Sequence, residues 1–319
     1  MAKRVIYIVV LLLIPILIPA QGLAFWIWTP ETNKWVNPKY AVKETPGEQL
    51  QYAIEYIEAE DYNGAIRELR KLLKHYPRAK EAPEAQYHIG QCFQAQGKIF
   101  EAFKQYQEVI DKYPFSELAG DIVKKQYDIG VEILEGRRKR NKIVETLAGD
   151  HYNIVEVFRT VIKNAPYGEY APSAQYKIGL YLQEKKMYQE ARDEYEKVIN
   201  DYPESEWSKA AKYQIAITDA ERSADSQYDQ KITQSAVEEL KDFVATYPDA
   251  ELSQDAKQEI RRLKEKEAEN NYLIAQFYEK QRNYKAAKIY YQIVVDQYNE
   301  SPWTVPSLKK IRELSQKEK

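Results

Sequence analysis

The side chains that most often perform catalysis or bind metals are few in this sequence and far apart. The three histidines are His75, His88 and His151, and the single cysteine is Cys92. This spacing excludes the local His and Cys sets that hold zinc or an iron–sulfur cluster. There is no glycine-rich phosphate loop and no serine nucleophile elbow, and carboxylate pairs on charged helices are almost always solvated. We therefore expect no enzyme, no metal, no cofactor and no small-molecule substrate.

A better candidate for a binding site is a set of mostly tyrosine residues that recurs in register. Each stands three positions before a small residue, and we name them the ladder residues: Leu50, Tyr87, Tyr127, Tyr176, Tyr213 and Tyr272. Flat rings that carry hydroxyls suit the gripping of an extended peptide. With Ile54, Val131 and Leu134 they form a candidate peptide groove, in which we expect Tyr87 and Tyr127 to keep their ring faces exposed. Aromatic stripes at helical spacing more often pack in a core, which slightly favours that alternative.

One dense cluster of charge stands out, and it is basic. Its members are Arg137, Arg138, Lys139, Arg140 and Lys142. The cluster suits an acidic partner or anionic lipid headgroups, although a solvated loop tip is the favoured interpretation. The whole chain holds 47 Lys and Arg against 49 Asp and Glu, a net charge of −2. That balance argues against a dedicated nucleic-acid binder, which needs a basic excess.

These residues lie on a segment that is repeated six times. Tyr-Pro or a close variant ends each segment, at Tyr76-Pro77, Tyr113-Pro114, Ala165-Pro166, Tyr202-Pro203, Tyr247-Pro248 and Tyr298-Asn299. The shortest interval is 37 residues and occurs twice. A fixed period of this length with helical patterning is typical of a solenoid of helix pairs.

The spacing inside the segments resembles the tetratricopeptide repeat. Two units place a small residue, a second small residue, an aromatic and a proline at the same offsets. In the second unit these residues are Gly90, Ala102, Tyr106 and Pro114, and in the fourth unit they are Gly179, Ala191, Tyr195 and Pro203. Small side chains let two helices approach, and proline cannot continue the second helix. We predict an all-α tetratricopeptide-repeat superhelical solenoid of about six helix pairs.

The repeat also divides the chain. We assign residues 45–166 to N-terminal units 1–3, residues 167–302 to C-terminal units 4–6, and residues 303–319 to a capping helix. An addition of 14 residues before Ala275 is almost four helical turns, and it predicts one long helix from Ala250 to Lys280. Cys92 lies in a helical pattern between Ile89 and Phe93, where burial as a small hydrophobe is expected.

The N-terminus has a different character. Residues 1–24 hold Lys3 and Arg4, an apolar run and Gly22-Leu23-Ala24, the layout of a secretory signal peptide. An uncleaved anchor is the lesser alternative. Residues 25–44 hold three of the five tryptophans around a Pro/Asn turn, which allows a short hairpin. We favour aromatics that cap the first hydrophobic layer over an anchor at a membrane interface.

The signal peptide, the units that end in Tyr113-Pro-Phe-Ser116 or Tyr202-Pro-Glu-Ser205, and a closing module from Leu263 to Ser301 together resemble the BamD (YfiO/ComL-like) family. The resemblance implies a periplasmic scaffold, associated with the outer membrane, that takes part in β-barrel assembly. Its implied partners are the barrel-assembly pore protein and unfolded outer-membrane proteins. The sequence lacks the lipobox cysteine that the family normally carries. Two alternatives stay open, a general periplasmic adaptor for envelope or cell-division complexes, and a repeat module held by an uncleaved anchor.

Overall fold

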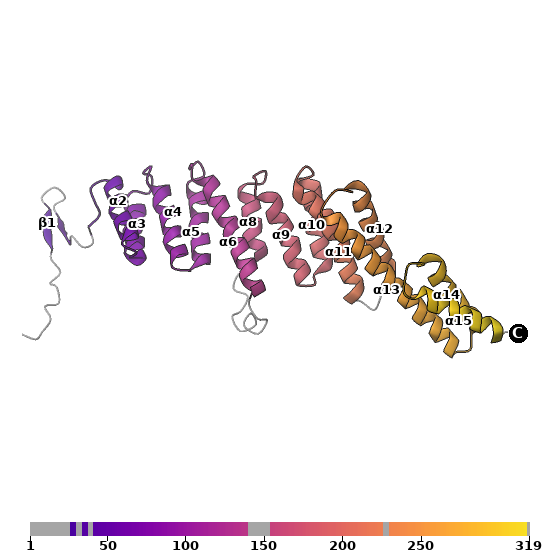
Figure 1. Ribbon diagram of the computed structural model, residues 1–319. Coiled ribbons are helices and arrows are strands. Elements are labelled where there is room, and N and C mark those ends of the chain that lie inside the picture. The colour runs from indigo at the N-terminus through magenta and orange to yellow at the C-terminus, as the bar shows by residue number, and fades with distance from the viewer. Residues whose placement is uncertain (1–25, 30–33, 38–40, 140–153, 226–229, 318–319) are drawn as a thin grey trace, which may run out of the picture. The chain divides into compact units, whose positions relative to one another are not determined.

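The protein is described here by a computed structural model that covers residues 26–29, 34–37, 41–139, 154–225 and 230–317 (Figure 1). Within these residues the chain forms thirteen helices and one sheet of two strands. The all-α repeat fold predicted from the sequence is thereby confirmed. The chain divides into two compact units, one up to Leu118 and the other from Ala119. The grouping of repeats at residues 166 and 167 stays a prediction.

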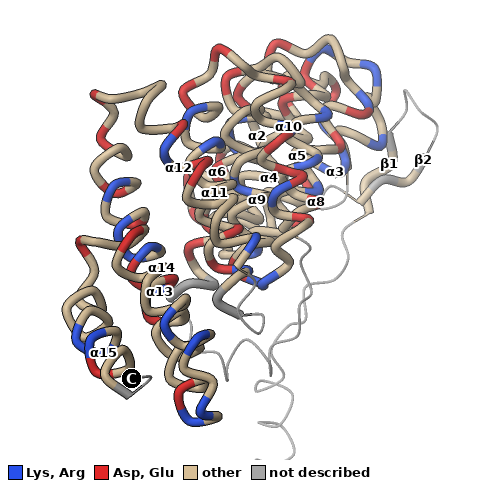
Figure 2. Tube along the Cα trace, turned by 90° about the vertical axis from the view of Figure 1, so that its right-hand side faces the viewer, with Lys and Arg blue, Asp and Glu red and all other residues tan. Residues whose placement is uncertain are grey.

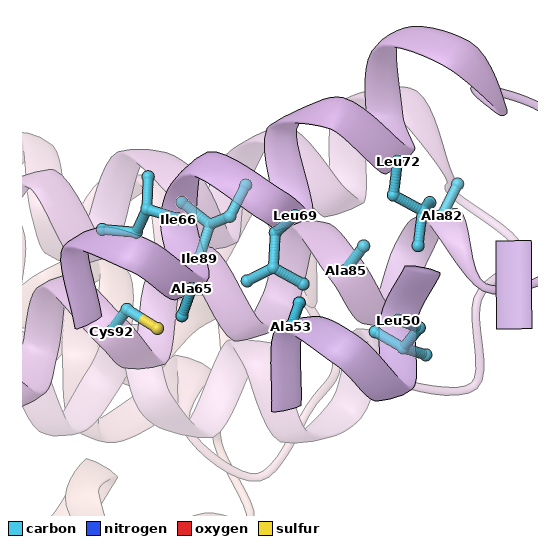
Figure 3. Packing of buried hydrophobic residues seen from close by; sticks show 10 residues of the cluster. All are labelled: Leu50, Ala53, Ala65, Ile66, Leu69, Leu72, Ala82, Ala85, Ile89 and Cys92. Atoms are coloured by element: carbon cyan, nitrogen blue, oxygen red, sulfur yellow. The ribbon is translucent and has the colours of Figure 1, made fainter. Parts of the chain in front are cut away.

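The first unit contains the hairpin and two helix pairs. Its elements are β1 (Ile27–Thr29), β2 (Lys34–Val36), α2 (Pro46–Glu58), α3 (Tyr62–His75), α4 (Ala82–Ala95) and α5 (Ile99–Lys112). Each helix packs against the next along the chain. Figure 3 shows how α2, α3 and α4 bury one cluster of aliphatic side chains, with Cys92 among them. Burial raises the pKa of the Cys92 thiol to about 11, so this cysteine behaves as a small hydrophobe.

The second unit contains the other helices. They are α6 (Ala119–Lys139), α8 (Ile154–Asn164), α9 (Ala171–Glu184), α10 (Tyr188–Asp201), α11 (Glu206–Asp225), α12 (Gln230–Thr246), α13 (Leu252–Lys280), α14 (Tyr284–Gln297) and α15 (Thr304–Lys317). The expected long helix is α13, whose 29 residues extend about 44 Å. The C-terminal helix α15 packs on α14 and buries Leu314, as a capping helix requires.

The glycines of the repeat lie where two helices cross closely. A Cβ atom on Gly90, Gly130 or Gly179 would lie 2.5–2.7 Å from a ring carbon of Tyr106, Phe158 or Tyr195, respectively. These three rings are fully buried and cannot move aside. In these three pairs glycine therefore sets the separation between the two helices, as the sequence pattern indicated.

In four helix pairs the turn between the helices has a left-handed residue at one fixed position, seven after the small residue of the crossing. The residues there are Glu60, Gly97, Lys186 and Arg282, with φ between 58° and 72°. Most helix pairs end with a tyrosine whose N–H still donates to a carbonyl four residues earlier, as at Tyr113 and Tyr202, and Ala165 makes the same bond in the third pair. A proline follows these tyrosines and stops the helix.

Charge is distributed evenly over the described helices. Figure 2 shows acidic and basic residues interspersed along them. The predicted basic cluster falls at the end of α6, where Arg137–Lys139 are helical and therefore not loop as expected. The remaining two members, Arg140 and Lys142, lie outside the described residues. The signal peptide assigned to residues 1–24 lies outside them as well.

Candidate peptide-binding groove

Each ladder tyrosine packs one side of its ring against an aromatic residue of the following helix. The ring centroids lie 5.3–6.1 Å apart in the pairs Tyr87–Tyr106, Tyr127–Phe158, Tyr176–Tyr195, Tyr213–Phe243 and Tyr272–Tyr291. The edge or face that remains is the only part of each ring that a ligand could touch. The ring contacts fit the packing interpretation of the ladder, and its role as a peptide groove stays a prediction.

Three of the predicted groove residues are core residues instead. Leu50, Leu134 and Tyr272 are buried, with less than a tenth of their surface exposed. Leu50 joins the cluster of α2, α3 and α4, and Tyr272 joins the cluster of α13, α14 and α15. Ile54 packs partly buried against the first cluster, and Val131 is also partly buried. At these positions the side chains bury their apolar surface in the core, which stabilises the fold, and do not present it to a ligand.

A second aromatic packs against three of the ladder tyrosines. Tyr170 lies 5.0 Å from Tyr127, Trp207 lies 5.0 Å from Tyr176, and Trp303 lies 4.9 Å from Tyr272, measured between ring centroids. Each of these covering residues stands four positions after the Pro, or Asn, that closes its repeat. We name this the covering position.

Tyr127 is covered more than expected. Its ring lies between Phe158 and Tyr170, and its hydroxyl is hydrogen-bonded to Ser173 at 2.5 Å. Burial raises the pKa of the Tyr127 phenol, although the bond to Ser173 opposes that shift. The expectation that Tyr127 would present a free ring face is thus wrong, while its neighbour Ile129 is buried as expected.

Tyr87 and Tyr213 have leucines at the covering position, Leu118 and Leu252, which carry no ring. Beside Tyr87 a groove of about 840 Å³ opens within the first unit. Its lining comes from the start of α4, the end of α5 and the segment that follows, and consists of Lys80, Pro83, Glu84, Tyr87, His88, Lys112, Tyr113, Pro114, Phe115, Ser116, Glu117 and Leu118. We name this the Tyr87 groove.

The Tyr87 groove combines apolar surfaces with charges of both signs. Phe115 projects beside it with 99% of its surface exposed, which is unusual for a large apolar side chain. His88 forms a hydrogen bond of 2.8 Å with Gln91 and lies 3.6 Å from the Glu84 carboxylate. A segment of protein with one large apolar side chain and polar flanks would match this lining.

The rim of the groove is held by the hydroxyl of Tyr113. This hydroxyl donates to the carbonyl of Pro77, at 3.2 Å, and so ties the turn after α5 to the turn after α3. Burial raises the pKa of the Tyr113 phenol. Lys112 is paired with Glu108, and that hydrogen bond raises the pKa of the Lys112 ammonium. The lysine therefore stays positively charged at the groove at neutral pH.

Sequence reasoning missed a recurring polar link beside the ladder. The residue just before a ladder residue is Gln49, Gln86 or Gln175 in three units, and its amide donates to the backbone carbonyl 19 residues later, at 3.1–3.3 Å. The signal was present in the repeated Ala-Gln-Tyr text of the sequence. Because these amides are buried and paired, the link fixes the ladder helix against its partner.

The covering position and Phe115 were also missed. The covering residues could have been found from their constant offset to the closing proline. Phe115 stands one residue after such a proline, where Tyr167 is the other large aromatic and is 96% exposed. The sequence alone does not say which ladder ring a covering residue touches, because the two lie 31 to 43 residues apart.

A partly buried ionic network ties α10, α11 and α12 together. The Arg192 guanidinium donates to Asp219 at 2.5 Å, to Glu239 at 3.1 Å and to Glu196 at 3.1 Å. Burial raises the pKa of the Glu239 carboxyl, against the opposing effect of Arg192. Because three carboxylates already surround the guanidinium, the network links the three helices and does not form a binding site.

The described residues offer no arrangement for metal chemistry. Among them, no three His, Cys, Asp or Glu side chains come together in a way that could hold a metal ion. No helix in the same part of the chain combines the length and apolar content needed to span a membrane.

Comparisons with known proteins agree with the fold. A family model for a tetratricopeptide repeat matches residues 84–116. A solved tetratricopeptide-repeat protein from Bacteroides fragilis is 16% identical, covers 70% of this chain and 99% of its own, and has a TM-score of 0.45. A second, from Parabacteroides merdae, is 12% identical, covers 86% of this chain and all of its own, and has a TM-score of 0.36. A search of curated proteins gave no match.

The family model YfiO, described as outer membrane lipoprotein, matches residues 146–317. This match includes the long helix α13 and the closing module on which the sequence resemblance depended. Since it spans more than half of the chain, the protein belongs to the YfiO family of BamD-like tetratricopeptide-repeat proteins.

Proposed function

We propose that this protein is a periplasmic scaffold of outer-membrane protein assembly, and that the Tyr87 groove holds an extended segment of an unfolded β-barrel protein. The observation that carries the proposal is a ladder tyrosine, Tyr87, that has a leucine at its covering position and also lines a groove of about 840 Å³. Family membership supports the cellular setting, because the family is described as outer membrane lipoproteins.

The chemistry of the groove supports a segment that carries an aromatic side chain. Tyr87 and the exposed Phe115 offer two rings, and an aromatic pair contributes about 0.5–1.5 kcal/mol beyond its buried area. Strands of outer-membrane barrels alternate apolar and polar residues, with aromatic girdles at both interfaces. Such a strand, when unfolded and extended, presents apolar side chains at every second residue, with aromatic ones near its ends.

The second unit supports a different kind of contact. Leu273 and Phe277 stand four residues apart on α13, so they share a face, and both are exposed. Ile289 on α14 is exposed too. We propose that the last repeat docks a folded partner through these apolar side chains, and that the partner is the barrel-assembly pore protein. The replacements Leu273→Ser and Phe277→Ser together should abolish its recovery in a pull-down, whereas a different envelope partner in the wild-type pull-down would favour a general periplasmic adaptor.

Peptide binding tests the groove. A fluorescent peptide from the last strand of an outer-membrane barrel is titrated with the protein, and anisotropy gives the Kd. Tyr87→Ala should weaken binding by about 1–2 kcal/mol, which is roughly five- to thirtyfold in Kd. Phe115→Ser should act in the same direction without affecting folding, because this ring is almost wholly exposed.

The matched control is Tyr167→Ser. Tyr167 is equally exposed and occupies the same place after a repeat's closing proline, but the ladder ring of that unit is covered by Tyr170. Its replacement should leave the Kd unchanged. If Tyr167→Ser weakens binding as much as Phe115→Ser does, or if neither has an effect, the Tyr87 groove is not the peptide site.

A further inference from the structure

The N-terminal hairpin exposes an unusual amount of aromatic surface. Trp26 is 57% exposed, Trp28 is 42% exposed and Trp35 is 63% exposed, and Ile27 on the other face of the strand is exposed as well. We name residues 26–29 with 34–37 the tryptophan hairpin. Large aromatic side chains that gather on a surface in this way mark an interaction site far more often than a free surface.

The tryptophan hairpin is held together by its own pairing. Strands β1 and β2 run antiparallel with Trp28 directly opposite Trp35, and their rings lie 5.7 Å apart at an angle of 60°. The hydrophobic cluster of the first unit is built from α2, α3 and α4 together with partly buried neighbours that begin at Ile54. Among the described residues, none of the hairpin belongs to that cluster. The expectation that these aromatics cap the first hydrophobic layer is therefore wrong.

The composition of the hairpin and its place in the sequence point to lipid rather than to an anionic ligand. Trp is enriched at membrane–water interfaces because its ring is apolar while its N–H reaches a polar group. Residues 25–44 carry three Lys and two Glu, so charge attraction contributes little there. The hairpin also follows closely on the apolar run from Val5 to Ile18, a segment of the kind that is directed to a membrane.

We propose that the tryptophan hairpin inserts into the interfacial layer of a phospholipid bilayer and holds the first repeat at the membrane surface. Its small two-stranded sheet presents rings on a face that no described helix covers, and such a wedge can lie at headgroup depth without crossing the bilayer. The attachment is independent of the Tyr87 groove. It needs no lipidated cysteine, and the single cysteine of the sequence is buried in α4.

Tryptophan fluorescence tests this placement. The double variant Trp207→Phe/Trp303→Phe keeps a ring over Tyr176 and Tyr272 and leaves only the three hairpin tryptophans to emit. The full chain is mixed with vesicles of phosphatidylethanolamine and phosphatidylglycerol that contain a phosphatidylcholine brominated either high or low on the acyl chain. On vesicle-bound protein the emission should move to shorter wavelength, and bromine high on the chain should quench it more strongly than bromine low on the chain.

The matched control is Trp26→Ser/Trp28→Ser/Trp35→Ser, whose emission comes from Trp207 and Trp303 and should not be quenched by either lipid. Quenching reports the depth of the hairpin tryptophans themselves. Unquenched emission from the hairpin of bound protein would overturn the proposal. Stronger quenching by bromine low on the chain would also overturn it, because it indicates a segment that spans the bilayer. A shift of the emission wavelength that depends on protein concentration in the absence of vesicles would overturn it too, because it indicates that a second copy of the chain covers the hairpin.

Discussion

A glycine in α6 allows the packing at the helix crossings to be tested directly. A Cβ atom at Gly130 would lie 2.7, 3.0 and 3.1 Å from three ring carbons of Phe158. Carbon atoms in contact prefer about 3.5–4.0 Å, so the ring would have to move by about 1 Å. Phe158 is fully buried, and the movement must therefore separate α6 from α8.

The two opposing effects of Gly130→Ala can be weighed. Overpacking of this kind costs about 1–3 kcal/mol, while alanine gains about 1 kcal/mol of helix propensity over glycine. We expect a net loss of up to about 2 kcal/mol in the free energy of unfolding. At about 2–4 °C per kcal/mol for a unit of this size, the melting temperature measured by circular dichroism should fall by up to several degrees.

The same helix supplies the control. Gly120 is exposed and a Cβ atom there would have no neighbour within 4 Å. Gly120→Ala should therefore leave the melting temperature unchanged or raise it, by up to about 1 kcal/mol of stability. Effects of the same sign from the two substitutions would refute the explanation of the glycine pattern given above.

Three further predictions concern stability. Ala191→Leu should lower the free energy of unfolding by about 1–3 kcal/mol, because Ala191 is fully buried at a helix crossing, whereas Lys185→Leu on the surface should have almost no effect in the same melts. Tyr195→Phe should cost about 1–2 kcal/mol in urea unfolding, since the hydroxyl donates to the buried Gln183 at 2.9 Å and its loss leaves that acceptor with one partner fewer. Glu267→Gln should stabilise the protein at neutral pH, because burial raises the pKa of the Glu267 carboxyl and disfavours its ionised form in the folded state. That gain should disappear as the pH falls through the raised pKa, where the wild-type carboxyl is protonated too; a gain that persisted in acid would contradict the assigned cause.

The features that the sequence predicted well depend on spacing within one helix pair. Small residues at the crossing, the aromatic on the second helix and the closing proline stand at fixed short offsets, and their packing follows from helix geometry. The long helix α13 was predicted because 14 added residues return the apolar stripe to nearly the same face.

The state of each ladder tyrosine could not be predicted in this way. Whether the ring is covered depends on a residue at the start of the next pair, which is Tyr170 for Tyr127 but Leu118 for Tyr87. Only the three-dimensional register between consecutive pairs shows that these positions meet. Core packing and surface presentation also compete for one ring, and the outcome depends on the size of a single neighbour.

The hairpin was misjudged for a related reason. A general tendency of large aromatics to be buried favoured contact with the first hydrophobic layer. In the structure α2, α3 and α4 bury their own aliphatic cluster. The chain before α2 is held instead by the Tyr76 hydroxyl, which donates to the carbonyls of Lys43 and Glu44 at 2.8 and 3.0 Å. The composition of a segment does not reveal whether the neighbouring core has room for it.

Photo-crosslinking in living cells tests the peptide groove most directly. A photoreactive phenylalanine analogue is placed at Phe115, which is 99% exposed beside the Tyr87 groove, and separately at Tyr167, which is 96% exposed in the second unit. Adducts identified by mass spectrometry should contain unfolded outer-membrane barrel proteins for the probe at Phe115 and not for the probe at Tyr167. Absence of such adducts at Phe115, or equal yields at both positions, would contradict the assignment of this groove as the site that receives unfolded barrel proteins.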